Sequence, residues 1–151
     1  MPSNYKGSPA EVEALSAFIN LMRASESVAS SMQQDIDQNK ITPSQFGILE
    51  TLLHLGPLYQ GELATKLLRA TGSITSVVEG LEKKGLVLRT RETHDKRFVR
   101  VTLTPEGKKV IEHVFPKHVR AVLQTFGALT LEEQRELRRL CGKLGKSAMK
   151  K

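Results

Sequence analysis

Apolar residues recur at steps of three and four positions along most of the chain, which is the spacing of one buried helical face. The first such stretch covers about residues 9–38 and is long for a helix of a small domain. A second stretch follows Thr42, where a threonine N-cap, Pro43 at the first helical position and Gln45 form a capping-box signature. Gly56, followed by proline, ends this second helix.

The pattern next predicts two shorter helices that are joined by a tight polar turn. One covers residues 61–68, and its leucines face inward: Leu63, Leu67 and Leu68. The other is capped by Thr71 and ends at Gly85. Its buried side consists of Ile74, Val77 or Val78, and Leu81. Two helices in this arrangement form a helix-turn-helix.

The apolar period then changes from nearly four to two, which indicates β-strands. Residues 86–92 and 98–104 alternate in polarity and are rich in β-branched side chains, and a polar break separates them. They predict an antiparallel hairpin with a basic tip. Thr104, followed by proline, begins a further helix, and Thr130 with Glu133 begins the last one through a second capping box.

The predicted fold is mainly α with a small β-hairpin wing. A winged helix-turn-helix core covers residues 41–104, and helices in residues 1–40 and 105–151 flank it. Both flanks carry long apolar stripes, and a single chain of this length has little else to cover them with. We therefore expect the N- and C-terminal helices to form the dimerisation region of a homodimer.

The distribution of charge changes the interpretation of the hairpin. The chain of 151 residues has a formal net charge of +7. Residues 1–40 carry three basic and five acidic side chains, a net charge of −2, whereas residues 83–100 carry seven basic and two acidic ones, a net charge of +5. A solvated hairpin tip does not need this much charge, so the excess predicts a polyanionic partner.

Several classes of protein are disfavoured by the sequence. It has no run of 18 apolar residues and no apolar signal-peptide core, so we expect a cytoplasmic protein without a membrane partner. No catalytic constellation or phosphate loop stands out, and no two histidines are four residues apart, so we predict no enzyme, metal or cofactor. The single cysteine, Cys141, lies on the apolar stripe of the last helix, where we predict a buried small hydrophobe instead of a redox sensor.

Three motifs in a fixed order carry a resemblance to a known family. They are "LEKKGLVLR", the Asp-Lys-Arg at 95–97, and "VTLTPEGKKV". The chain resembles the MarR family of bacterial transcription regulators across the whole winged-helix core and, more loosely, across both flanks. The resemblance implies a homodimer that binds a pseudo-palindromic DNA operator, usually as a repressor, and that a small ligand or oxidation releases.

This chain departs from the family pattern at two places. Many members have Ser or Thr as the cap of the short helix where this chain has Tyr59, so we expect that turn to be held differently. The oxidation-sensing branch places its reactive cysteine in the first helix, and this chain has none there.

Two predicted elements would contact DNA. The helix after Thr71 would enter the major groove, where its serine and threonine hydroxyls can bond several bases or phosphates. Arg97 at the hairpin tip would enter the minor groove, with Asp95 holding its guanidinium. The neighbouring basic residues would mostly meet phosphates, and either Arg89 or Arg100 would be one of these phosphate contacts. The predicted DNA-contacting residues are Thr71, Ser73, Thr75, Ser76, Arg89, Arg91, His94, Asp95, Lys96 and Arg97.

Two further interpretations remain open from the sequence. A winged-helix module could instead use its basic wing on a protein or membrane surface. If the chain binds an effector, we expect a small phenolic or other aromatic molecule at the junction of the flanking helices and the core, because such junctions favour pockets. The candidate lining residues, for which plain core packing is the alternative, are Phe18, Met22, Phe46, Ile48 and Phe115.

Overall fold

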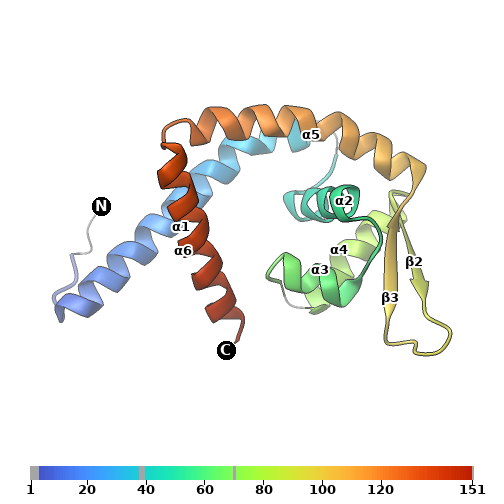
Figure 1. Ribbon diagram of the computed structural model, residues 1–151, viewed down its shortest axis with the longest axis horizontal. Coiled ribbons are helices and arrows are strands. Elements are labelled where there is room, and N and C mark those ends of the chain that lie inside the picture. The colour runs from blue at the N-terminus through green and yellow to red at the C-terminus, as the bar shows by residue number, and fades with distance from the viewer. Residues whose placement is uncertain (1–3, 38–39, 70, 151) are drawn as a thin grey trace.

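The computed structural model describes residues 4–37, 40–69 and 71–150, and the side chains of all of these except residues 34–37 and 71. The described part consists of long flanking helices around a compact group of short helices and strands (Figure 1). Its elements are α1 (Pro9–Asp37), α2 (Pro43–Leu55), β1 (Leu58–Tyr59), α3 (Gln60–Lys66), α4 (Thr71–Lys83), β2 (Val87–Arg91), β3 (Val99–Leu103), α5 (Pro105–Phe126) and α6 (Leu131–Met149).

The helix starts follow the predicted caps. The Thr42 hydroxyl accepts a hydrogen bond from the Gln45 amide at 3.1 Å, and the Gln45 side chain accepts one from the Thr42 amide at 3.1 Å. Thr130 and Glu133 form the same reciprocal pair at the start of α6. Each capping box satisfies amides that the first turn of a helix otherwise leaves without a partner.

The predicted winged helix-turn-helix is confirmed. Helices α2, α3 and α4 pack around one hydrophobic core, whose fully buried side chains include Ile48, Leu49, Leu63, Ile74 and Val78. Strands β2 and β3 form the antiparallel wing, with Val87 opposite Leu103 and Arg91 opposite Val99. A third strand, β1, pairs with the other edge of β3, so that the sheet order is β1-β3-β2.

The end of α3 corrects one sequence prediction. Leu63 is fully buried and Leu67 packs partly against the core, but Leu68 is 41% exposed and its backbone has a φ of +52°. This left-handed conformation is unfavourable for a residue with a Cβ. Here it turns the chain out of α3, which moves Leu68 off the inward-facing stripe.

The wing is joined closely to α5. The Thr104 amide donates to the Leu86 carbonyl at 3.1 Å, and the Thr104 hydroxyl donates to the Gly85 carbonyl at 2.6 Å. Gly107, in the first turn of α5, is buried against the same Leu86 peptide, where a Cβ would lie 2.9 Å from the carbonyl carbon. Only glycine permits this approach of two backbones.

The flanking helices leave much apolar surface uncovered in the single chain. Helix α1 packs along α5, and α6 turns back from the end of α5 and crosses α1 in the view of Figure 1. None of the described residues of α6 is buried, and Cys141 is exposed, so the prediction of a buried cysteine is wrong for one chain alone. Exposed large apolar residues on these helices are Leu15, Phe18, Met22, Val119, Leu123, Leu131, Leu137, Leu140, Leu144 and Met149.

Candidate DNA interface

Helix α4 presents a short polar face. Its buried side consists of Ile74, Val78 and Leu81, with Val77 partly buried, so the predicted choice between the two valines resolves to Val78 as the deeper residue. Ser73 and Ser76 are exposed on the other side. These hydroxyls are free to meet a major groove, and α4 begins at Thr71, whose side chain lies outside the described residues.

Thr75 is not the outward-facing residue that the sequence predicts. It is half-buried, and its hydroxyl accepts a hydrogen bond from the Gln60 side chain at 3.2 Å. Gln60 is buried at the start of α3 and lies across the turn of the helix-turn-helix. The contact therefore ties the recognition helix to the helix before it, and among the described side chains of this part of α4 it leaves Ser73 and Ser76 as the exposed hydroxyls.

The tip of the wing carries the arginine fork that the sequence predicts. The Arg97 guanidinium donates to both carboxylate oxygens of Asp95, from Nε at 3.0 Å and from Nη2 at 2.8 Å, and the Arg97 amide donates to Oδ1 at 3.1 Å. These bonds, with the side-chain bond foremost, hold the pKa of Asp95 below its ordinary range. The Arg97 side chain is nevertheless 88% exposed. A bidentate pair of this kind fixes the direction of an arginine without covering it.

Three other basic residues lie at or near the tip of the wing. Lys96 and His94 are exposed at the tip. Arg91 extends across the hairpin, where its Nη1 donates to the Lys96 carbonyl at 2.9 Å. It therefore stabilises the loop that carries Arg97, and its remaining donors are still exposed.

Arg89 is held between the wing and the recognition helix. Its guanidinium donates to Glu82 from Nε at 3.2 Å and from Nη2 at 3.1 Å, and to Glu79 from Nη1 at 3.4 Å. The Arg89 amide also donates to Glu82, at 3.0 Å. Hydrogen bonding to Arg89 lowers the pKa of Glu82 from its ordinary value. Only 26% of the Arg89 side chain is exposed, so in this geometry it is a clamp between β2 and α4, and its contact with phosphate stays a prediction.

A second clamp lies on the opposite side of the sheet. The Tyr59 hydroxyl donates to Glu92 at 2.9 Å and accepts from Arg100 at 3.1 Å, and Arg100 also pairs with Glu92 at 3.5 Å. Sequence reasoning did not find this group, because it joins residues that are more than 30 positions apart. The only signal was the tyrosine at a position where a short capping side chain is usual.

A cavity of about 550 Å³ lies where α1, α2, α5 and α6 meet. Phe46 and His118 lie on its wall with their ring centroids 4.5 Å apart, and Glu50, Ser25 and Cys141 add polar atoms. Among the described residues that line it, none is Lys or Arg. The apolar part of the wall is formed by Leu21, Ala24, Val28, Ala29, Met32, Pro43, Phe46, Val122, Phe126 and Leu137.

Of the predicted effector residues, the structure places one on this cavity. Phe46 lines it. Ile48 is fully buried in the core, and Phe115 packs against the core and against the His54 ring at 4.7 Å. Phe18 and Met22 are exposed on α1, Phe18 before the lining residues and Met22 between Leu21 and Ala24, and neither lines the cavity. The signal that was missed is the small size of Ala24, Ser25 and Ala29 on the lining side of α1, which leaves space between the helices.

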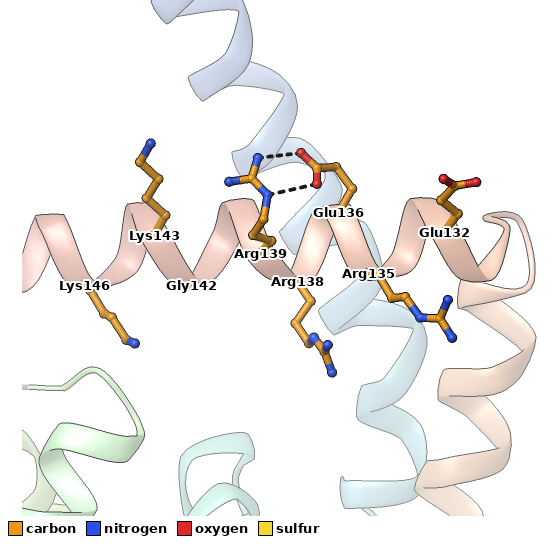
Figure 2. Close-up of a pocket in the computed structure, with 8 residues that line it drawn as sticks. All are labelled: Glu132, Arg135, Glu136, Arg138, Arg139, Gly142, Lys143 and Lys146. Atoms are coloured by element: carbon orange, nitrogen blue, oxygen red, sulfur yellow. Dashed lines mark hydrogen bonds and ion pairs between the residues drawn. The ribbon is translucent and has the colours of Figure 1, made fainter.

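A larger but open hollow lies along α6 alone. Figure 2 shows its charged side chains extending from one helix, with Arg138 and Lys146 on one side and Arg139 and Lys143 on the other. Arg139 forms a bidentate ion pair with Glu136, from Nε at 2.9 Å and Nη2 at 2.6 Å. Because one exposed helix supplies every wall, we interpret this hollow as a solvated face.

Membrane-spanning segments and metal-binding clusters are both absent from the described part of the chain. No described helix is long and apolar enough to cross a membrane. No group of three or more His, Cys, Asp or Glu residues within the described ranges could hold a metal ion.

Comparison with known proteins agrees with this geometry. The model of the MarR family matches residues 41–99. The HTH-type transcriptional regulator MhqR of Bacillus subtilis is 33% identical over 121 residues, which are 80% of this chain and 83% of MhqR. A helix-turn-helix transcriptional regulator as a relative favours DNA over the protein or membrane surface that the basic wing alone left open.

Solved structures extend the similarity to the flanking helices. A structure of BpsR from Bordetella bronchiseptica, whose DNA binding is regulated by 6-hydroxynicotinic acid, matches with a TM-score of 0.75 at 27% identity, over 85% of this chain and 97% of BpsR. NadR in complex with 4-hydroxyphenylacetate matches with a TM-score of 0.73 at 28% identity, over 97% of this chain and 99% of NadR. The winged helix-turn-helix, the charged wing and these relatives together place this chain in the MarR family of DNA-binding transcriptional regulators.

Proposed function

We propose that this protein is a homodimeric, cytoplasmic repressor that binds a pseudo-palindromic operator and leaves it when a small aromatic molecule binds. The observation that carries the DNA-binding part is the wing tip, where Arg97 is fixed by Asp95 and still 88% exposed. An arginine held in this way suits a narrow minor groove, whose negative potential attracts an inserted guanidinium. Ser73 and Ser76 on α4 would then read the adjacent major groove.

The same proposal assigns a role to each part of the chain. Residues 41–104 bind DNA, and residues 1–40 and 105–151 dimerise. The uncovered apolar side chains of α1, α5 and α6 support this division, since exposed apolar surface of this extent marks an interface. Two copies related by a twofold axis would place two recognition helices on successive turns of the operator, roughly 34 Å apart.

We assign the effector to the cavity between α1, α2, α5 and α6. Its wall is largely apolar and includes the Phe46 and His118 rings, which suits a flat aromatic molecule. Helix α2 of the DNA-binding core and helices α1, α5 and α6 of the flanks all contribute to the wall, so a ligand here would favour one relative placement of the two regions.

The charge of the cavity wall indicates whether the effector is neutral or anionic. Glu50 is the one formally charged side chain among the described lining residues. A ligand carboxylate beside it would be a second anion with no cation among the described lining residues, which is unfavourable. A neutral phenol can instead donate its hydroxyl to Glu50 or His118. We therefore expect a neutral phenol to bind better than the acidic aromatic compounds named with BpsR and NadR.

Two compounds of the same size test this assignment: 4-hydroxyphenylacetamide, which is neutral, and 4-hydroxyphenylacetate, which is an anion. We expect the amide to raise the Tm more and to release operator DNA at lower concentration. Glu50→Gln should reduce the difference between the compounds, whereas Glu62→Gln on α3, outside the cavity, should not. Equal or tighter binding of the anion to the unmodified protein would contradict the assignment. If neither compound binds while operator binding is intact, the effector part of the proposal fails and the DNA-binding part stands.

A further inference from the structure

Tyr59 occupies a place in the fold where a short polar side chain is usual. It is the last residue of β1 and the N-cap of α3. Its amide donates to the Glu62 carboxylate at 3.0 Å, so the first turn of α3 is partly capped from within the helix. The Tyr59 side chain makes no cap bond and is free to extend toward the wing.

The Tyr59 side chain holds both ends of the wing tip. Glu92, which accepts from the Tyr59 hydroxyl at 2.9 Å, follows the last residue of β2. Phe98, whose ring centroid lies 5.6 Å from that of Tyr59, comes directly before β3. The Glu92 amide donates to the Phe98 carbonyl at 3.0 Å and closes the loop between them. The loop of five residues that carries Arg97 therefore begins and ends on partners of one tyrosine.

Arg100 completes the group from β3. Its Nη2 donates to the Tyr59 hydroxyl at 3.1 Å, and its guanidinium carbon lies 4.9 Å from the centroid of the Tyr59 ring. Tyr59 and Arg100 are also direct partners in the pairing of β1 with β3. The hydroxyl thus lies between a carboxylate and a guanidinium, both of which bond it more strongly than water-exposed neutral partners would.

The two faces of the wing are therefore tied to different helices. Arg89 ties β2 to α4 through Glu82, and Tyr59 ties the tip and β3 to the start of α3. Since Arg97 directly precedes Phe98, its direction relative to α4 depends on this second tie. We propose that Tyr59 is a positioning residue: it sets how the wing presents Arg97 to the DNA and does not contact the DNA itself. This proposal rests on DNA binding as the function.

Tyr59→Phe tests the proposal, because it removes the hydroxyl and keeps the ring against Phe98 and Arg100. We expect operator binding to weaken by about fivefold to tenfold, because the wing would then hold the binding-competent direction only about a fifth to a tenth of the time. The loss of one hydrogen-bonded group should lower the Tm by only a few degrees, about 2–6 °C. In a chain that already has Arg97→Ala, the same change should cost nothing further, since the residue that Tyr59 positions is gone. Tyr5→Phe, at the other tyrosine of the chain, is the matched control and should leave operator binding unchanged.

The double-mutant cycle separates this role from its alternatives. An equal loss from Tyr59→Phe with and without Arg97 would mean that Tyr59 acts independently of the arginine, and it would overturn the proposal. Unchanged operator binding by Tyr59→Phe would overturn it as well. If the unmodified protein binds no operator at all, the proposed function fails before the role of Tyr59 is at issue.

If the Tyr59→Phe variant does not fold, a second variant still tests the proposal. Glu92→Gln leaves the tyrosine intact and replaces its charged acceptor by a neutral amide. We expect it to weaken operator binding in the same direction and, again, only when Arg97 is present.

The chain has no tryptophan and two tyrosines, so in a Tyr5→Phe background Tyr59 is the single intrinsic fluorophore. Its emission should rise on Glu92→Gln, because a carboxylate acceptor quenches tyrosine, and unchanged emission would contradict the contact.

Discussion

Replacing Arg89 by methionine tests whether this arginine joins the wing to the recognition helix. The substitution keeps an unbranched side chain on β2 and leaves the hydrogen bond from the residue 89 amide to Glu82 in place. It removes the donors to Glu82 at 3.2 and 3.1 Å and to Glu79 at 3.4 Å. Glu79 and Glu82 are then left without that cation, beside the proposed DNA-binding surface.

The size of the effect follows from the exposure of the pair. Charge-assisted hydrogen bonds contribute about 1.5–3 kcal/mol when sheltered, whereas exposed ion pairs contribute about 0–1 kcal/mol. The Arg89 and Glu82 side chains are 26% and 36% exposed, which lies between these cases. We therefore expect Arg89→Met to lower the free energy of unfolding by about 1–2 kcal/mol, discounted for solvent screening. For a chain of this size the Tm would fall by about 2–8 °C.

The pH dependence identifies the carboxylate involved. The folded-state pKa of Glu82 is lowered from 4.5 by its bond to Arg89, so the stabilisation is fully present above that ordinary value. It is lost as the pH falls through the lowered pKa, because protonation removes the charge of the carboxylate. Urea unfolding at fixed protein concentration should therefore show a difference between the two proteins at about pH 7 that shrinks below about pH 4.

Arg91→Met is the matched control on the same strand. Arg91 donates to the carbonyl of Lys96, and it has no carboxylate within ion-pair distance among the described side chains. Its replacement should have a smaller effect that does not follow a carboxylate titration. If Arg89→Met left the free energy of unfolding unchanged at about pH 7, or lowered it equally at all pH values, the clamp would be the wrong account of Arg89.

Three further outcomes are expected. Arg97→Ala should weaken operator binding by about tenfold to a hundredfold with little change in Tm, and unchanged affinity in a folded dimer would refute minor-groove insertion. The logarithm of operator affinity should fall with the logarithm of salt concentration by about 0.9 per phosphate neutralised, and a flat response would point to a partner other than DNA. Gly107→Ala should lower the free energy of unfolding by about 2–4 kcal/mol because its Cβ meets the Leu86 peptide. Gly61→Ala, which meets open space, should change it by about 1 kcal/mol or less, and equal effects at the two glycines would contradict the packing.

The parts of the fold that depend on neighbouring residues could be predicted from the sequence. The Thr42 and Thr130 caps are local signals that act within one helical turn, and the structure has both. The fork between Asp95 and Arg97 is also local, since the residues are two positions apart. Strand β1 was not predicted because two residues carry no measurable alternation, and only pairing with β3 makes them a strand.

The parts that depend on distant residues could not be predicted. Arg89 has the same chemistry as the exposed Arg97, and only the packing of α4 against β2 brings Glu82 within its reach. The hydrogen bond from Gln60 that keeps Thr75 off the outer face likewise joins two helices. Cys141 lies on an apolar stripe as expected, but a stripe does not tell whether its own chain or a second copy covers it.

The preference of the purified protein for its own operator tests the central claim most directly. Operator DNA selected from a random library and a shuffled duplex of the same composition would be titrated against the protein at one fixed salt concentration. If α4 and the clamped wing read DNA together, the selected duplex should bind about 10³-fold more tightly or better, and it should contain two related half-sites. Equal affinity for the two duplexes would contradict sequence-specific recognition by this surface.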